Sequence, residues 1–293
     1  MDKSKVYCTK QITPESLIRV YNAIGVTLND RVAVKISTGE PGGHNFLNPN
    51  LIKDLVTKLK GTIVECNTAY PGRRNTTEEH WKTFEEHGFK AIAPCDILDE
   101  EGEMAIPVPN GKHLKENYVG AHLKNYDSIL ILSHFKGHLM AGFGGALKNM
   151  SIGLASSRGK ILIHTSGTST KFEDAFTADQ NSFLESMAEA AQSIIYYIGS
   201  KNLAYINVAN NLSIDCDCAA NPHDPEMADI GIFASADPVA LDQACVDAIY
   251  NSPDGGKKAL IERMESRNGI HVLEAAVELG IGSREYELIL LDE

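Results

Sequence analysis

Short apolar runs alternate with amphipathic stretches along most of the chain. The amphipathic stretches, such as "NPNLIKDLVTKLK" and "FLESMAEAAQSIIYYIG", repeat their apolar residues at helical spacing and therefore predict helices. The apolar runs have the length of buried strands, and they lie at residues 31–37, 61–67, 127–133, 160–166, 203–209 and 229–235. This alternation predicts an α/β fold of three layers, in which a mainly parallel sheet carries helices on both faces.

Residues that commonly begin helices precede several of the amphipathic stretches. Thr13 and Asp237 each stand directly before a proline, which favours the first position of a helix. Thr76 is followed three residues later by Glu79, which is the spacing of a capping box. These signals support the predicted alternation of strand and helix.

Two segments interrupt the alternation. Residues 93–120 are rich in loop-forming residues, and we expect a small hairpin there at the edge of the core. Residues 166–180 are rich in Ser, Thr and Asp, which is typical of a long loop or of a reduced insertion point. A domain boundary would fall in this second segment, but we expect one α/β domain over residues 1–293.

Composition and charge disfavour several classes of protein. The formal net charge of -12 argues against a nucleic-acid partner, because nucleic-acid binding requires a basic surface. No run approaches the roughly 18 apolar residues of a membrane span, and the first residues lack a secretory signal pattern. We therefore expect a soluble, cytoplasmic protein without a membrane partner. A homodimer is compatible with the sequence. An acidic chain can still bind a small anionic ligand in a pocket that collects lysines, arginines and backbone N–H groups.

The stretch "SHFKGHLMAGFGGALKN" directly follows the apolar run that ends the third predicted strand. In a parallel sheet, ligands bind beyond the carboxyl ends of the strands, so this position favours a functional role. His134, His138 and Lys148 are the candidate catalytic residues, because imidazole can transfer a proton or bind a metal and lysine adds charge.

The same stretch offers candidates for binding a cofactor. They are Lys136, which adds positive charge, and three glycines that allow close approach of the backbone to a ligand, Gly142, Gly144 and Gly145. We also expect the helix that begins near Ala146 to direct free N–H groups toward that ligand. The alternative is that the glycines serve helix packing and that the histidines are structural.

Two further loops contain candidate ligand-binding residues. Arg73 and Arg74 follow a predicted strand and a Pro-Gly turn, where guanidinium groups could bind a carboxylate or phosphate. His44 lies near Glu40 in a loop with two glycines and could form an acid/base or ligand pair with it. The alternative for both loops is an ordinary solvated surface.

The loop "DCDCAANPHD" collects soft and hard metal ligands within ten positions. Cys216 and Cys218 are candidate ligands of a metal ion, iron or zinc, although one Cys-x-Cys pair falls short of a full four-ligand pattern. Free thiols or a thiol redox role are the alternatives, as is a nucleophilic Cys216 near His223 or Ser133 near His134. The scattered positions of the remaining cysteines favour reduced, mostly buried thiols.

Several blocks of the chain together resemble the domain-of-unknown-function 362 family, particularly its iron–sulfur centre protein group. These blocks are "NTAYPGRRNTTEEHWKTFEEHGF", "LSHFKGHLMAGFGGALKNMSIGLASSRGK", "CDC" and "DIGIFASADPVALDQACVDAIYN". By position, the resemblance implies a shared site at His44, Arg73, Arg74, His134, Lys136, His138, Gly144, Gly145, Lys148, Cys216 and Cys218.

The chain departs from that group at one point. Members of the group typically carry a ferredoxin-like insert with clustered cysteines, whereas residues 166–180 contain no cysteine here. No 4Fe-4S ferredoxin motif is therefore present, and electron transfer through such an insert is not expected.

We expect a pocket at the strand carboxyl ends that binds a metal or an anionic cofactor. We expect the protein to be an enzyme or a redox-linked protein. Two alternatives remain. One is a non-catalytic binding or carrier module that lost the iron–sulfur insert. The other is a hydrolase or transferase that depends on Cys216.

Overall fold

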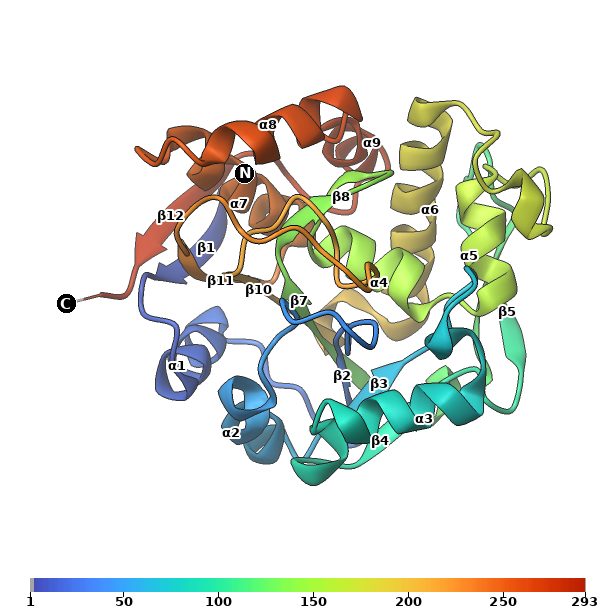
Figure 1. The fold of residues 1–293 in the computed structure, drawn as a ribbon, viewed down its shortest axis with the longest axis horizontal. Coiled ribbons are helices and arrows are strands. Elements are labelled where there is room, and N and C mark those ends of the chain that lie inside the picture. Colours follow the sequence, from blue (N-terminus) through green and yellow to red (C-terminus); the bar gives the residue numbers. More distant parts are fainter. Residues whose placement is uncertain (1–2, 293) are drawn as a thin grey trace.

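The computed structural model describes residues 3–292, in which helices flank one large sheet (Figure 1). Within these residues the sheet has eight strands. In spatial order they are β12 (Tyr286–Leu290), β1 (Ser4–Thr9), β11 (Gly231–Ser235), β10 (Leu203–Ala209), β7 (Ser128–His134), β2 (Val32–Lys35), β3 (Thr62–Glu65) and β4 (Cys95–Ile97). Two small hairpins lie outside it, formed by β5 (Glu103–Pro107) with β6 (Glu116–Gly120) and by β8 (Lys136–His138) with β9 (Gly142–Gly144).

Most neighbouring strands of the large sheet run parallel. β7 is parallel to β10 and β2, and β3 is parallel to β2 and β4. β11 is antiparallel to both β10 and β1, and β12 is parallel to β1. The predicted α/β fold with a mainly parallel sheet is therefore confirmed. The carboxyl ends of β2, β3, β7 and β10 meet at one edge of the sheet.

Helices cover both faces of the sheet. One face carries α1 (Pro14–Ile24), α2 (Pro49–Leu59) and α3 (Thr77–Glu86). Helices that pack into the core on the other face are α4 (Ala146–Leu154), α5 (Ser157–His164), α6 (Gln180–Ile198), α7 (Pro238–Asn251), α8 (Lys257–Ser266) and α9 (His271–Glu278). No helix among residues 3–292 is long and apolar enough to cross a membrane.

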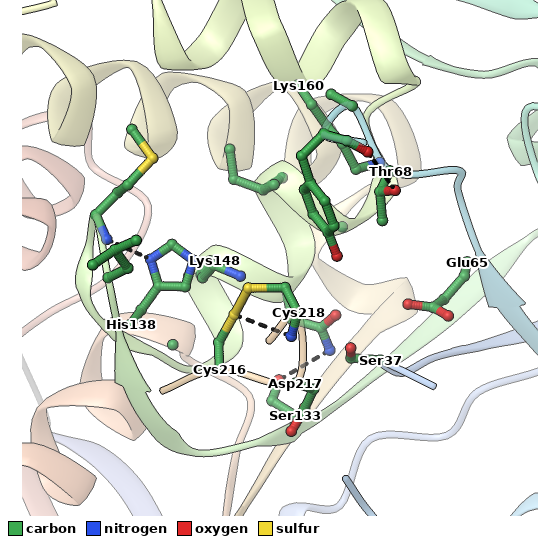
Figure 2. A pocket seen from close by; sticks show the side chains of 18 of the residues that line it. Ser37, Glu65, Thr68, Ser133, His138, Lys148, Lys160, Cys216, Asp217 and Cys218 are labelled. Carbon is green, nitrogen blue, oxygen red and sulfur yellow. Dashed lines mark hydrogen bonds between the residues drawn. A yellow bond between two sulfur atoms is a disulfide. The ribbon is translucent and has the colours of Figure 1, made fainter. Parts of the chain in front are cut away.

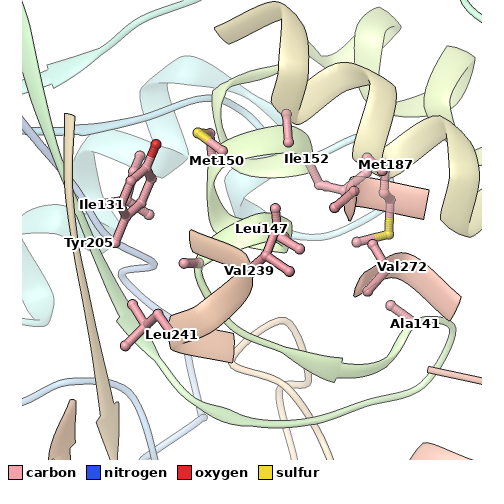
Figure 3. Close-up of a cluster of buried hydrophobic side chains, with 14 of the residues drawn as sticks. Ile131, Ala141, Leu147, Met150, Ile152, Met187, Tyr205, Val239, Leu241 and Val272 are labelled. Carbon is pink, nitrogen blue, oxygen red and sulfur yellow. The ribbon is translucent and has the colours of Figure 1, made fainter. Parts of the chain in front are cut away.

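The central strand β7 shows why its sequence is continuously apolar. Ile129 and Ile131 pack into the hydrophobic cluster beneath α4, α6, α7 and α9, part of which is drawn in Figure 3. Leu130 and Leu132 pack into the cluster on the opposite face, against α1 and α2. Successive side chains of a strand point to opposite faces, so a strand covered on both sides must be apolar at every position.

Five of the six predicted strands are confirmed, and the strand predicted at residues 160–166 is wrong. Residues 160–166 fall largely in helix α5, which begins after Ser156. The Ser156 side chain accepts a hydrogen bond from the Gly159 N–H and so caps this helix. A short apolar run does not distinguish a strand from one buried side of a helix, and here the serine cap decides.

The predicted helix starts are confirmed at Thr13 and Asp237, whose side chains accept N–H groups of the first turns. Thr76 also precedes a helix, but its side chain makes no cap hydrogen bond. Glu79 binds Arg73 and Lys82 instead of closing a capping box. The expected hairpin in residues 93–120 is present as β5 and β6.

The beginning of α4 is held by a buried carboxylate rather than left free. Asp242 on α7 accepts the N–H groups of Ala146 and Leu147, at 2.7 and 3.0 Å, and the Asn207 amide at 2.7 Å. A Cβ on Gly145 would lie 2.3 Å from an Asp242 oxygen, so this glycine permits the contact. The expectation that these N–H groups point at a ligand is therefore wrong, because another side chain already occupies them.

Asp242 gives a pH-dependent prediction for stability. Burial raises the pKa of this carboxyl to about 6, so between about pH 4 and 7 the folded protein holds a proton that the unfolded chain releases. The stability advantage of wild type over Asp242→Asn should therefore shrink by about 2 kcal/mol between pH 4.5 and 7.5. Urea unfolding of both proteins at pH 4.5 and 7.5 measures this change. Asp54→Asn, which removes an exposed carboxylate from α2, is the control, and a pH-independent difference for Asp242→Asn would contradict the prediction.

Candidate functional site

A cavity of about 340 Å³ lies where the carboxyl ends of the parallel strands meet. Its walls come from the ends of β2, β3 and β7, from the β8–β9 hairpin, from α4 and α5, and from the loop that carries Cys216 and Cys218 (Figure 2). The predicted site residues among its lining are Arg74, His134, Lys136, His138, Gly144, Gly145, Lys148, Cys216 and Cys218. Segments far apart in the sequence thus form one site.

Three predicted residues do not line this cavity. Arg73 lies on the surface and binds Glu79 and Glu86. The His44 side chain is 59% exposed and contacts Asp224. Gly142 lies where a Cβ would meet the backbone of Met264 and Gly269, so it serves the packing of the β8–β9 hairpin.

Four lysines line the cavity, and they differ in their partners. Lys136 Nζ donates to Asp217 Oδ2 at 2.7 Å and to the His134 carbonyl at 2.8 Å. Lys35 donates to the Asn149 side chain, and Lys160 donates to the Ala155 carbonyl. Within residues 3–292, Lys148 Nζ has no hydrogen-bond or ion-pair partner, and Figure 2 shows its amine directed into the cavity.

Two of these lysines have a lowered pKa because they are buried. Burial lowers the pKa of Lys35 to about 8, although Glu65 partly opposes the shift. Burial, together with the charge of Lys136, lowers the pKa of Lys148 to about 7. A bound anion would favour the charged form of each amine and so offset that cost.

The two neighbouring arginines have different surroundings. The Arg74 side chain is 3% exposed, and its guanidinium binds Glu40 at 2.9 Å and Glu65 at 3.2 Å. Burial alone would raise the pKa of Glu65, but the charge of Arg74 holds it well below the usual value. Arg74 therefore organises the floor of the cavity through carboxylates of this chain.

His134 is a positioning residue rather than a free base. Its Nδ1 contacts Asp217 Oδ1 at 2.8 Å and its Nε2 contacts the Asn210 carbonyl at 2.7 Å. Both ring nitrogens face oxygen acceptors, so neither is available to a ligand in this arrangement. Burial would raise the pKa of Asp217, but Lys136 and His134 hold it well below its usual value.

His138, Cys216 and Cys218 form a group that could hold a metal ion, since one possible ligand atom from each lies within 4.8 Å of the others. Two observations define its present chemical form. The two sulfurs are joined in a disulfide. His138 Nδ1 accepts the N–H groups of Met140 and Ala141, at 3.2 and 2.9 Å, so the neutral ring carries its proton on Nε2.

These observations set the conditions for a metal. Thiolates bind metals and a disulfide does not, so the donor set of two Cys and one His is complete only after reduction. A metal-bound histidine usually donates its second N–H to an acceptor, whereas Nδ1 of His138 faces two donors. The sulfur atoms therefore fit a soft metal in the reduced protein, and the histidine fits only after its ring rearranges.

The expectation of reduced thiols holds for the other cysteines, since Cys8, Cys66, Cys95 and Cys245 are free. Sequence reasoning did not select several cavity residues, among them Lys35, Glu65, Asn149, Lys160, His164 and Asp217. Lys35 had a readable signal, because a lysine within the apolar run "VAVKI" is a buried charge that needs a partner.

The two adjacent arginines provide a matched pair of variants. Arg74→Gln leaves Glu40 and Glu65 buried without their cationic partner and should lower the free energy of unfolding by about 3–5 kcal/mol. Arg73→Gln should change stability little, because its ion pairs are exposed to solvent. Chemical denaturation of both variants tests this, and equal effects would show that the buried network does not depend on Arg74.

Two solved structures are similar over most of this chain at low sequence identity. The lactate racemase apoprotein from Thermoanaerobacterium thermosaccharolyticum is 15% identical with a TM-score of 0.47, and the match covers 83% of this chain and 56% of that chain. A protein from Thermotoga maritima is 13% identical with a TM-score of 0.45, and the match covers 87% of this chain and 58% of that one. The present chain thus spans less than two thirds of either.

Sequence comparison identifies the family of this chain. No curated protein significantly matches the chain. The family described as domain of unknown function (DUF362) matches residues 32–247, which confirms the resemblance carried by the sequence blocks. This chain belongs to the DUF362 family.

Proposed function

We propose that this protein binds an anionic small molecule in the cavity at the strand carboxyl ends and acts on it as an enzyme. One observation carries the proposal. Lys148 directs its amine into the cavity, and no carboxylate or hydrogen-bond acceptor within residues 3–292 pairs with it. A partly buried amine without a partner is costly, and a ligand carboxylate or phosphate would supply the missing charge.

The balance of charge around the cavity supports an anion. Five lining side chains are lysine or arginine, and two are carboxylates. Arg74 is paired with Glu65, and Lys136 is paired with Asp217. Lys35, Lys148 and Lys160 are left without a carboxylate partner among residues 3–292, although the whole chain has a net charge of -12. A local positive field of this kind attracts small anions.

One group in the cavity favours an enzyme over a carrier module. Lys148, with a pKa of about 7, can gain or lose a proton near neutral pH. A group with this property beside a bound ligand is suited to general acid–base catalysis. His138 is neutral at pH 7, because burial and the charge of Lys148 hold its pKa well below the usual value, and its Nε2–H can donate a hydrogen bond to a ligand.

Removal of the Lys148 charge tests anion binding. Lys148→Met should weaken binding of small phosphates or carboxylates about 10-fold to 100-fold, which is the range for one hydrogen bond to a charged group. Lys148→Arg should retain part of the affinity, and Lys201→Met, at an exposed position, should retain all of it. Isothermal titration with phosphate, pyrophosphate and dicarboxylates gives the affinities. The proposal fails if no anion in the panel shows binding that depends on Lys148.

Turnover separates an enzyme from a carrier. Wild-type protein is incubated with a mixture of cellular metabolites, and mass spectrometry follows which anions disappear and which products form. Consumption by wild type that is absent in Lys148→Met supports an enzyme. Stoichiometric retention of one anion without product would favour the carrier alternative.

A second proposal concerns the metal. The two sulfurs of Cys216 and Cys218, joined by His138 once its ring rearranges, favour a soft metal ion, zinc or iron, bound at the cavity wall in the reduced protein. A metal there would polarise an anion held by the lysines. The alternative of a Cys216-dependent hydrolase or transferase also needs reduction, because the nucleophile must be a free thiolate.

Metal analysis under two redox conditions tests this second proposal. Reduced wild-type protein prepared without oxygen should bind about one zinc or iron per chain, because only thiolates are metal ligands. Oxidised wild type and the Cys216→Ser/Cys218→Ser double variant should bind none at this site. Cys95→Ser, which removes a free and partly buried thiol, is the control. Equal metal content in the reduced wild type and the double variant would exclude these cysteines as ligands.

A further inference from the structure

A second cavity of about 290 Å³ adjoins the first. The two share four lining residues, which are Leu139, Met140, His164 and Phe176. Leu139 and Met140 come from the turn between β8 and β9, and Phe176 comes from the segment before α6. Because the same side chains line both, the lysine-rich cavity and the second cavity lie side by side.

The wall of the second cavity carries both apolar and polar side chains. Beyond the shared residues it is lined by Ala175, Ala178 and Phe183, with Gln180 and Arg267 as its polar members. Gln180 already donates to two backbone carbonyls, those of Met140 and Arg267. Burial lowers the pKa of His164 to about 4, so this ring is neutral at pH 7, and it stacks on Phe183 with ring centroids 4.9 Å apart.

Two side chains that line both cavities are unusually exposed for their type. Phe176 is 67% exposed and Leu139 is 53% exposed. Large apolar side chains that gather in solvent at the mouth of a cavity mark a binding surface. They lie beside lysines that lack carboxylate partners, so one ligand with a charged end and an apolar end would satisfy both features.

We propose that the ligand is an amphipathic anion, with its carboxylate or phosphate group at Lys148 and an apolar chain or ring against Leu139, Met140 and Phe176. This inference deepens the proposed function and rests on it. The lysines select the charge of the ligand, and the apolar side chains shared by the two cavities contact its apolar part. A small, wholly polar anion would leave Leu139 and Phe176 exposed to solvent.

A series of n-alkyl phosphates from methyl to hexyl tests the inference by isothermal titration. Affinity for wild-type protein should rise about fourfold for each added methylene that is buried. The matching n-alkyl carboxylates form the second arm, and the head group that binds more tightly identifies the anion. Hexanol, which lacks the charge, should bind more weakly than hexyl phosphate.

Variants locate the chain and separate the two proposals. Phe176→Ser and Leu139→Ser should lower the gain in affinity per methylene, whereas Leu288→Ser, at a similarly exposed leucine on β12, should not. Equal affinity for methyl and hexyl phosphate, with both dependent on Lys148, would overturn this inference and leave the anion site intact. If binding in neither series depends on Lys148, the proposed function itself fails.

Discussion

Asp217 is the residue on which the arrangement of the site depends. Its carboxylate binds His134 and Lys136, and its backbone carbonyl accepts the Glu40 N–H at 2.7 Å. One residue therefore ties together the loops that follow β2, β7 and β10. Desolvation of a carboxylate is expensive, and the two side-chain partners make it tolerable here. Because Asp217 stands between Cys216 and Cys218, the same contacts hold the sulfurs at the cavity wall.

The central part of the fold could be predicted from sequence, and its edges could not. β2, β3, β7, β10 and β11 are buried throughout or nearly so, and continuous apolar runs report this directly. β12 is an edge strand whose residues are only partly buried or exposed, so it leaves no such run. The incorrect strand at 160–166 had the right hydrophobicity, but a helix with one buried side shows the same short pattern.

The position of the site could be predicted from the polar residues that follow the strands. The burial and the partners of each side chain could not. Arg73 and Arg74 are neighbours in sequence, yet one is exposed and the other lies in a buried network with Glu40. Asp242 caps α4 by binding Ala146, which lies 96 positions earlier in the sequence. No local sequence pattern predicts this contact. Such pairings depend on tertiary packing, which periodicity and motif spacing do not encode.

The chemistry of the cations has a consequence for recognition. Among residues 3–292, Arg74 is the only arginine that lines the first cavity, and it already binds carboxylates of the protein. The cations left for a ligand in that cavity are therefore lysine amines. A guanidinium imposes a planar, two-pronged geometry, whereas an ammonium on a flexible stem is a point charge with rotatable donors. The lysines therefore distinguish ligands by their charge more than by their shape. Discrimination among anions of similar charge must come from the other side chains that line the cavity. Substitution of those side chains alone would give related chains different ligands.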